Sequence, residues 1–112
     1  MNLGRYALVI APILTVGAIT ACSGRESAEP RAHAVSIANF AFDPSEVVVA
    51  PGDTVVWTNA DFVPHTATAS DSRWDSGSLA ANATWRFVAE DRGRYEYYCL
   101  LHPTMRGSIV VR

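Results

Sequence analysis

Residues 98–107 of the chain read Tyr98-Cys99-Leu100-Leu101-His102-Pro103-Thr104-Met105-Arg106-Gly107. This stretch places a thiol, an imidazole and a thioether at intervals of three residues, at Cys99, His102 and Met105. Soft sulfur donors favour copper, and two histidines with one cysteine and a weakly bound methionine form the blue-copper arrangement. We therefore predict three ligands of a copper site here, with Cys99 ending one strand, Met105 starting the next and His102 in the loop between them.

The fourth ligand must come from a distant strand, and His65 is the candidate. It lies 34 residues before Cys99, in a chain that has three histidines. The remaining histidine, His33, ends a polar segment and has no ligand-type residue beside it, so we expect its side chain to be solvated. A folded sheet that brings His65 to the 98–107 stretch would complete the site.

Each of these residues taken alone has an ordinary structural explanation. Met105 could fill the core, Cys99 could be a buried inert thiol, and His102 could be a surface histidine. If the protein is exported, as its N-terminus indicates below, a disulfide between Cys22 and Cys99 is the main structural alternative. The combination of two histidines, a cysteine and a methionine favours a metal site. Zinc could load such a site in vitro, but a methionine ligand argues for copper.

Outside this stretch the pattern is that of short strands. No helical period persists, and turn sequences at Asp43-Pro44, Pro51-Gly52-Asp53 and 90–93 separate the apolar runs. The expected strands lie at residues 35–42, 46–50, 54–58, 65–69, 83–88, 94–99 and 108–112. Seven to eight short strands at this spacing predict an all-β sandwich.

The N-terminus has the pattern of an export signal. Arg5 precedes an apolar run over 6–21, which at 16 residues is short for a spanning helix of roughly 20 residues. The run ends in Ile19-Thr20-Ala21-Cys22, which resembles the lipobox of bacterial lipoproteins. We predict a signal peptide at 1–21, lipid attachment at Cys22 and a flexible tether over 22–33. A simple cleaved signal and a retained anchor are the alternatives, and all three place the domain outside the cytoplasm.

Length and charge exclude several classes of function. A chain of 112 residues is one small domain rather than a large multidomain enzyme. The formal net charge of −2 lacks the basic excess of a nucleic-acid binder, and all nine basic residues are arginines, which excludes lysine catalysis. A copper enzyme would need an open coordination position or additional histidines, and the sequence has none to spare. We expect a monomer that is not an enzyme.

Several further stretches, together with the 98–107 stretch, resemble the cupredoxins, the small blue-copper proteins. They read Asn39-Phe40-Ala41-Phe42-Asp43-Pro44, PGDTVVWTN (51–59), Pro64-His65-Thr66 and GRYEYYC (93–99). The resemblance covers residues 34–112 and is greatest to the amicyanin and plastocyanin branch, since Cys-x2-His-x2-Met is the short amicyanin spacing. It implies a cupredoxin domain at 34–112, folded as a Greek-key β-sandwich of seven to eight strands with copper at one end, under the loops.

The resemblance also implies roles for individual residues. It places the copper ligands at His65, Cys99, His102 and Met105. Asn59, six residues before His65, matches an asparagine that braces the ligand loops of the family through hydrogen bonds. A brace of this kind orients the ligands and tunes the metal.

In this family the loop histidine reaches the surface, so His102 is the expected electron port. We expect an apolar collar around it, formed by Pro64, Leu101 and Pro103. The sequence departs from amicyanin at Val63, Leu101 and Thr104, where that family often has Met, Pro or a larger aromatic residue. The amine dehydrogenase that amicyanin serves is therefore not carried over as the partner.

The resemblance implies an electron carrier that cycles one copper ion between Cu(II) and Cu(I). Its partners would be redox proteins such as a c-type cytochrome, a dehydrogenase or an oxidase, bound transiently through a small interface. Lipid on Cys22 would tether it to the extracytoplasmic side of a membrane. The alternative is a copper-handling module without electron transfer, although such sites tend to be open and exchangeable.

Two substitutions test the predicted ligand set. Cys99→Ala should abolish the blue colour of the copper form, because the thiolate is the ligand that produces it. Met105→Leu should keep the colour and raise the midpoint potential, because the axial ligand tunes the potential of such a site. Visible spectra and redox titration measure both effects, and a Cys99→Ala variant that stayed blue would show that the ligand assignment is wrong.

Overall fold

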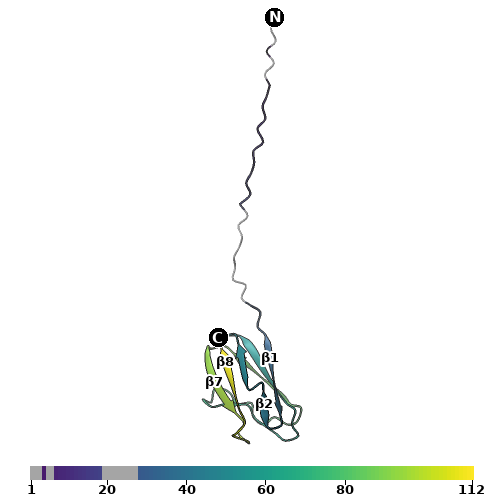
Figure 1. Cartoon of the computed structure of the whole chain (residues 1–112), viewed down its shortest axis with the longest axis vertical. Coiled ribbons are helices and arrows are strands. Elements are labelled where there is room, and N and C mark those ends of the chain that lie inside the picture. The colour runs from purple at the N-terminus through teal and green to yellow at the C-terminus, as the bar shows by residue number, and fades with distance from the viewer. Residues whose placement is uncertain (1–3, 5–6, 19–27) are drawn as a thin grey trace.

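The chain folds into β-strands arranged in two sheets (Figure 1), as seen in a computed structural model that describes residues 4, 7–18 and 28–112. The strands are β1 (Ala32–Ala38), β2 (Ala41–Asp43), β3 (Glu46–Val49), β4 (Asp53–Asn59), β5 (Thr68–Ala69), β6 (Thr84–Ala89), β7 (Gly93–Tyr98) and β8 (Arg106–Val111). Within the described residues, no helix has the length and apolar character needed to cross a membrane. The predicted all-β class is confirmed.

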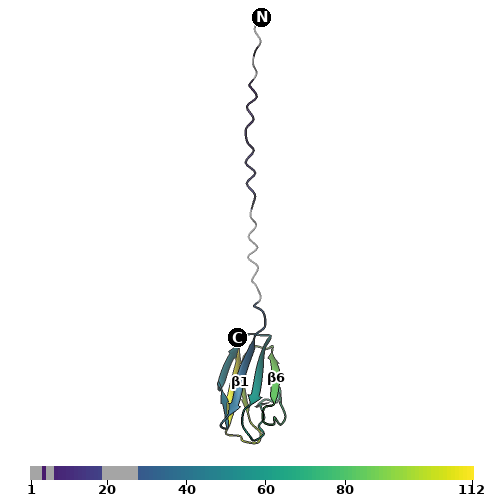
Figure 2. The same ribbon diagram turned by 90° about the vertical axis from the view of Figure 1, so that its right-hand side faces the viewer.

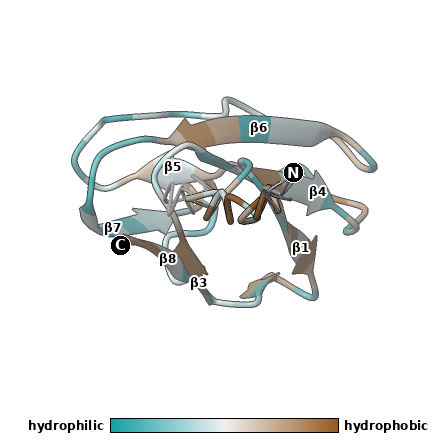
Figure 3. Cartoon of the chain, turned by 90° about the horizontal axis from the view of Figure 1, so that it is seen from above, coloured by the Kyte–Doolittle hydropathy of each residue, from teal (hydrophilic) through white to brown (hydrophobic). Residues whose placement is uncertain are grey.

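The two sheets pack face to face. One has the strand order β2-β1-β4-β6 and the other β3-β8-β7-β5. Figure 3 shows them end-on, with β1, β4 and β6 on one side and β3, β7 and β8 on the other. β1 with β4 and β3 with β8 form parallel pairs, while the other pairs are antiparallel. Parallel neighbours far apart in the sequence require crossovers between the sheets, as expected of the predicted Greek-key sandwich.

The space between the sheets is filled by large aromatic side chains. Trp57 and Tyr97 are the largest fully buried residues and meet edge to face, with ring centroids 5.4 Å apart. Phe42 contacts Tyr97 in the same way at 4.7 Å. Each such pair contributes about 0.5–1.5 kcal/mol beyond the burial itself. The Tyr97 ring also lies over Gly107, its partner in β8, where a Cβ would be 2.3 Å from the ring. Glycine thus lets β7 and β8 close tightly beside the loop that joins them.

Two predicted strands differ from those observed. The run at 35–42 is divided into β1 and β2 because Asn39 and Phe40 form a two-residue turn with φ angles of 52° and 57°. A left-handed conformation costs roughly 1–2 kcal/mol for a residue with a Cβ. The strand predicted at 65–69 is shorter, since only Thr68–Ala69 belongs to β5 and His65 pairs with Leu79 in an isolated bridge.

The fold has two distinct ends. In the parallel register of β1 and β4, Ala32 lies opposite Thr54 and Ile37 lies opposite Asn59. The start of β1 and the C-terminus therefore lie at one end, while the loops after β4 and β7 lie at the other (Figures 1 and 2). Both stretches that carry predicted ligands are in these two loops.

The prediction of a solvated His33 is wrong. β1 begins at Ala32, so His33 belongs to the sheet, and its Nε2 lies 2.9 Å from Oδ2 of Asp53. The same carboxylate accepts the backbone N–H groups of Arg31 and Ala50, each at 2.9 Å. The sequence around His33 contained no ligand-type neighbour because its partner lies 20 residues away, on the parallel strand.

The Asp53 contacts predict a pH dependence of stability. The N–H groups of Arg31 and Ala50, followed by His33, hold the pKa of Asp53 at about 2, below the ordinary value of 3.8. A depressed pKa stabilises the fold above the ordinary value, and the stabilisation is lost as the pH falls through the folded-state pKa. Asp53→Asn should therefore unfold more easily than the wild type near neutral pH, and the difference should shrink as the pH falls toward 2.

Urea unfolding followed by tryptophan fluorescence over a pH series measures this difference. Asp91→Asn is the matched control, because the Asp91 side chain is exposed and its ion pair with Arg73 is on the surface. A difference between wild type and Asp53→Asn that stayed constant down to low pH would contradict the prediction.

Candidate metal centre

Three of the predicted ligands converge at the loop end of the sandwich. The ligand atoms of His65, Cys99 and His102 all lie within 4.8 Å of one another. Sγ of Cys99 is 3.7 Å from Nδ1 of His65 and 3.7 Å from Nδ1 of His102. Cys99 and His65 are fully buried, whereas His102 is partly exposed. The two imidazoles thus present the same nitrogen to one sulfur, His65 from the loop between β4 and β5 and His102 from the loop between β7 and β8.

The loop between β7 and β8 is closed at its base by backbone hydrogen bonds. The Cys99 N–H donates to the Met105 carbonyl at 3.1 Å, and the Met105 N–H donates to the His102 carbonyl at 2.9 Å. Met105, the fourth predicted ligand, is buried directly before β8. The spacing of three residues therefore corresponds to a tight loop whose two ends are held together next to the Tyr97–Gly107 contact.

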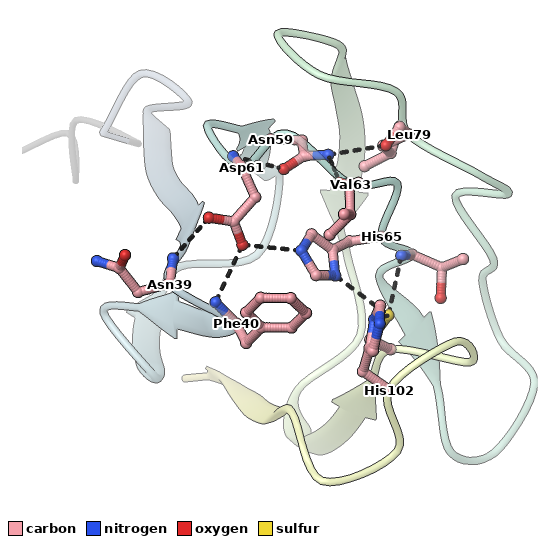
Figure 4. Close-up of polar contacts among 10 residues, drawn as sticks. Asn39, Phe40, Asn59, Asp61, Val63, His65, Leu79 and His102 are labelled. Atoms are coloured by element: carbon pink, nitrogen blue, oxygen red, sulfur yellow. Dashed lines mark hydrogen bonds and ion pairs between the residues drawn. The ribbon is translucent and has the colours of Figure 1, made fainter.

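A carboxylate orients His65 from the side opposite the sulfur. Nε2 of His65 lies 2.8 Å from Oδ2 of Asp61 (Figure 4). The backbone N–H of Phe40 above all, with the backbone N–H of Asn39 and the ring N–H of His65, holds the pKa of Asp61 below its ordinary value, against the opposing effect of burial. A charged carboxylate can only accept, so Nε2 of His65 is the donor of this bond, and in the neutral imidazole Nδ1 then keeps its lone pair. Sequence reasoning missed Asp61, and its place four residues before His65 was the only signal.

Asn59 makes the contacts expected of a brace. Its side-chain amide donates to the carbonyls of Val63 and Leu79, both at 2.9 Å, and its Oδ1 accepts the Asp61 N–H at 2.9 Å. The side chain is fully buried. Leu79 is in turn bonded to the backbone of His65 in both directions. Asn59 thereby ties the loop that carries His65 to the neighbouring segment.

Thr66 is a second residue that sequence reasoning missed. Its backbone N–H donates to Sγ of Cys99 at 3.3 Å, and its hydroxyl accepts the Leu100 N–H at 2.8 Å. These two bonds join the loop after β4 to the loop after β7. A hydrogen bond to the sulfur is one of the features that tune a copper–thiolate site. Position next to His65 was the signal that could have drawn attention to Thr66.

The surface at this end is apolar. Pro64, Leu101 and Pro103, the predicted collar, are all exposed, and the ring of His102 is partly exposed beside them. Further exposed apolar side chains extend the collar: Phe40, Phe62, Val63 and Leu100. Phe40 has its ring centroid 5.0 Å from that of His102. A partner that docked here would meet an apolar surface with the histidine ring within it.

The donor set fits copper. Two imidazole nitrogens and a cysteine sulfur surround one small volume, with a buried methionine on the same loop. Hard cations such as Mg²⁺ and Ca²⁺ prefer oxygen ligands, whereas sulfur with imidazole suits copper.

Residues 10–111 match the cupredoxin-like domain family. The chain belongs to this family. Amicyanin-alpha of Methylorubrum extorquens is 32% identical over 82 residues, which are 69% of each chain. Amicyanin of Paracoccus denitrificans is 29% identical over 69% of this chain and 63% of the relative.

Solved structures support the same assignment. A purple cupredoxin from Nitrosopumilus maritimus superposes with a TM-score of 0.68 at 29% identity, covering 70% of this chain and 98% of that one. A Cu(I) form of an amicyanin variant gives 0.68 at 29% identity, covering 72% and 82%. The predicted cupredoxin fold is thereby confirmed. Copper, predicted from the donor types, is the cofactor of this family, and the donor set of this cupredoxin fits it.

Substitution of Asn59 tests the brace. Asn59→Ala leaves the Val63 carbonyl and the Asp61 N–H without this partner and removes one of the two donors to the Leu79 carbonyl. Each buried unsatisfied group costs about 1–3 kcal/mol. We expect the free energy of unfolding to fall by at least the cost of one such group, about 1–3 kcal/mol. Asn59→Asp has nearly the same shape but turns an oxygen toward both carbonyls, so it should not restore stability.

Chemical denaturation of the three proteins measures the effect. Asn82→Gly is the matched control, because Asn82 is exposed and has a φ of 67°, which glycine adopts freely. An Asn59→Ala variant no less stable than this control would show that the amide is not a brace.

Proposed function

We propose that this cupredoxin is a blue-copper electron carrier whose ligands are His65, Cys99, His102 and Met105. The observation that carries the proposal is the pair of Nδ1 atoms, each 3.7 Å from one buried sulfur. Copper bound there would take up and release one electron. Its similarity to the amicyanins of this family favours the function of an electron carrier over that of an enzyme.

The residues around the ligands favour rapid electron transfer because they hold the site before any electron arrives. Asn59 fixes the His65 loop, Asp61 fixes the His65 ring, and Thr66 fixes the sulfur. A site whose donors are already placed has little to rearrange when the charge on the metal changes. His65, Cys99, His102 and Met105 would hold the copper, which would supply the one-electron redox chemistry.

The partly exposed ring of His102 is the proposed route for the electron. The collar of Pro64, Leu101 and Pro103 surrounds this port with apolar surface. A small apolar interface excludes water without long-lived ion pairs, so a redox partner can bind and leave quickly. We propose transient partners of the c-type cytochrome, dehydrogenase or oxidase class, and a monomeric carrier.

Export and lipid tethering belong to the same proposal. Cys22 and the rest of 19–27 lie outside the described residues, so lipid attachment rests on the sequence pattern. The apolar side chains of 8–16 are exposed and take no part in the core, in keeping with a signal segment. The start of β1 lies at the end of the sandwich opposite the metal centre. A tethered domain would therefore keep its electron port away from its attachment point.

Copper loading tests the proposal. Residues 23–112, which contain both sheets, are produced without metal, titrated with Cu(II) and followed by visible spectroscopy through reduction and re-oxidation. We expect an intense blue band at one copper per chain that bleaches with reductant and returns with oxidant. Cys99→Ser and His65→Ala should lose the band.

His33→Ala is the matched control, because His33 binds Asp53 at the opposite end and should leave the band unchanged. A pale spectrum, or copper that a chelator removes quickly, would instead favour copper handling without electron transfer.

A further inference from the structure

The turn between β1 and β2 contradicts local backbone preference. Ala38 and Ala41 pair across it, and the two residues between them, Asn39 and Phe40, have φ angles of 52° and 57°. Two-residue hairpin turns with both φ angles positive favour asparagine followed by glycine. Phenylalanine at the second position is unfavourable, since a bulky side chain rarely adopts the left-handed conformation. A conflict of this kind often marks a residue that is retained for the site it serves.

Asp61 holds this turn in place. Its Oδ1 accepts the Asn39 N–H at 2.7 Å and its Oδ2 accepts the Phe40 N–H at 3.0 Å. The same Oδ2 accepts Nε2–H of His65 at 2.8 Å. One carboxylate therefore connects a strained turn to a histidine of the metal centre, as Figure 4 shows.

The ring that the turn presents touches both histidines. Phe40 meets His65 with centroids 5.3 Å apart at 89°, and His102 with centroids 5.0 Å apart at 87°. The two imidazoles are themselves 4.9 Å apart. Rotation of either imidazole would change its edge-to-face contact with Phe40, and rotation of His65 would also break its bond to Asp61. The ring is half exposed, so burial alone does not account for its position.

We propose that Asp61 and Phe40 are positioning residues that hold both histidines of the copper site in their metal-binding orientation. Asp61 keeps the proton of His65 on Nε2 and leaves Nδ1 facing Cys99. By holding the 39–40 turn, it also sets the Phe40 ring against His65 and His102. The inference rests on the proposed function in one respect, namely that the two histidines are copper ligands.

The Asp61 half is tested with Asp61→Ala and Asp61→Asn. In metal-free protein, nitrogen NMR should report the Nε2–H form of His65 in wild type and Asp61→Asn, which keeps an acceptor, and a mixture of tautomers in Asp61→Ala. Loss of this type of support should weaken Cu(II) binding by about 10- to 100-fold in Asp61→Ala. Both variants should raise the midpoint potential, because removing a negative charge beside His65 disfavours Cu(II).

Asp91→Asn is the control for charge, since it removes an exposed carboxylate that does not contact the centre. If Asp61→Ala kept the Nε2–H tautomer, or if its potential moved no more than that of Asp91→Asn, the role assigned to Asp61 would be wrong.

The Phe40 half is tested with Phe40→Gly. Glycine suits the turn, so the free energy of unfolding should not fall in proportion to the lost side chain. Cu(II) release to a chelator should nevertheless become faster, and NMR relaxation of the two imidazoles in metal-free protein should show greater motion. Phe62→Ala is the control, because Phe62 is fully exposed on the same surface and has no ring contact among the described residues. Equal release rates and ring motion in Phe40→Gly and wild type would overturn this role.

The two proposals fail separately. A wild-type protein that never turned blue would refute the electron-carrier function, while the tautomer and ring-motion measurements in metal-free protein would still decide the roles of Asp61 and Phe40. Circular dichroism of each variant shows whether it remains folded.

Discussion

The hydrogen bond from the Thr66 backbone to the sulfur of Cys99 joins the loop that crosses from one sheet to the other to a loop within the second sheet. One loop follows β4 and carries His65, and the other links β7 to β8 and carries His102. The sulfur lies at the point where they meet, buried and within 3.7 Å of both imidazoles. The metal centre therefore exists only when the sandwich is assembled. Packing of Tyr97 over Gly107 and the amide contacts of Asn59 each support one of the two loops at its base.

The two ends of the sandwich carry two similar carboxylate clusters, one that stabilises the start of β1 and one that belongs to the metal centre. At one end, where β1 begins, the Asp53 carboxylate is hydrogen-bonded to His33 and accepts the backbone N–H groups of Arg31 and Ala50. At the other end, the Asp61 carboxylate is hydrogen-bonded in a similar way to the turn between β1 and β2 and to His65. Both carboxylates bind N–H groups from distant segments, and both have a lowered pKa for that reason. Only the second lies against an exposed apolar surface, where a partner could reach the histidine.

Local preference and the metal centre are in conflict at Phe40. A left-handed phenylalanine is unfavourable for the isolated turn, yet it places one ring against both imidazoles. The carboxylate that holds the turn also orients His65. Strain of this kind persists where the surrounding structure supplies enough contacts to impose it. The same contacts keep the donors in place, which is what a site that changes charge without changing shape requires.

Much of this protein could be predicted from the sequence alone, because the relevant signals are local. The alternation of apolar residues predicted short strands and an all-β sandwich, and the three-residue spacing of Cys99, His102 and Met105 predicted a copper-type donor set. The count of histidines left His65 as the candidate for the fourth ligand, and the resemblance to cupredoxins added Asn59. Each of these signals is a spacing along the chain, and strand or loop geometry converts such a spacing directly into a shared face or a shared loop.

Several contacts that sequence reasoning missed join segments distant along the chain. Asp53 lies 20 residues from His33, Asp61 lies 22 residues from Asn39, and Thr66 lies 33 residues from Cys99. Their meeting depends on how β1 lies against β4 and on how the two sheets face each other. Strand register and sheet packing depend on the core as a whole. A local sequence pattern therefore does not predict which side chains they bring together. The sequence alone therefore determined the kind of metal centre and indicated Asn59 as a brace, whereas only the tertiary structure decided that Asp61 and Thr66 contact His65 and Cys99.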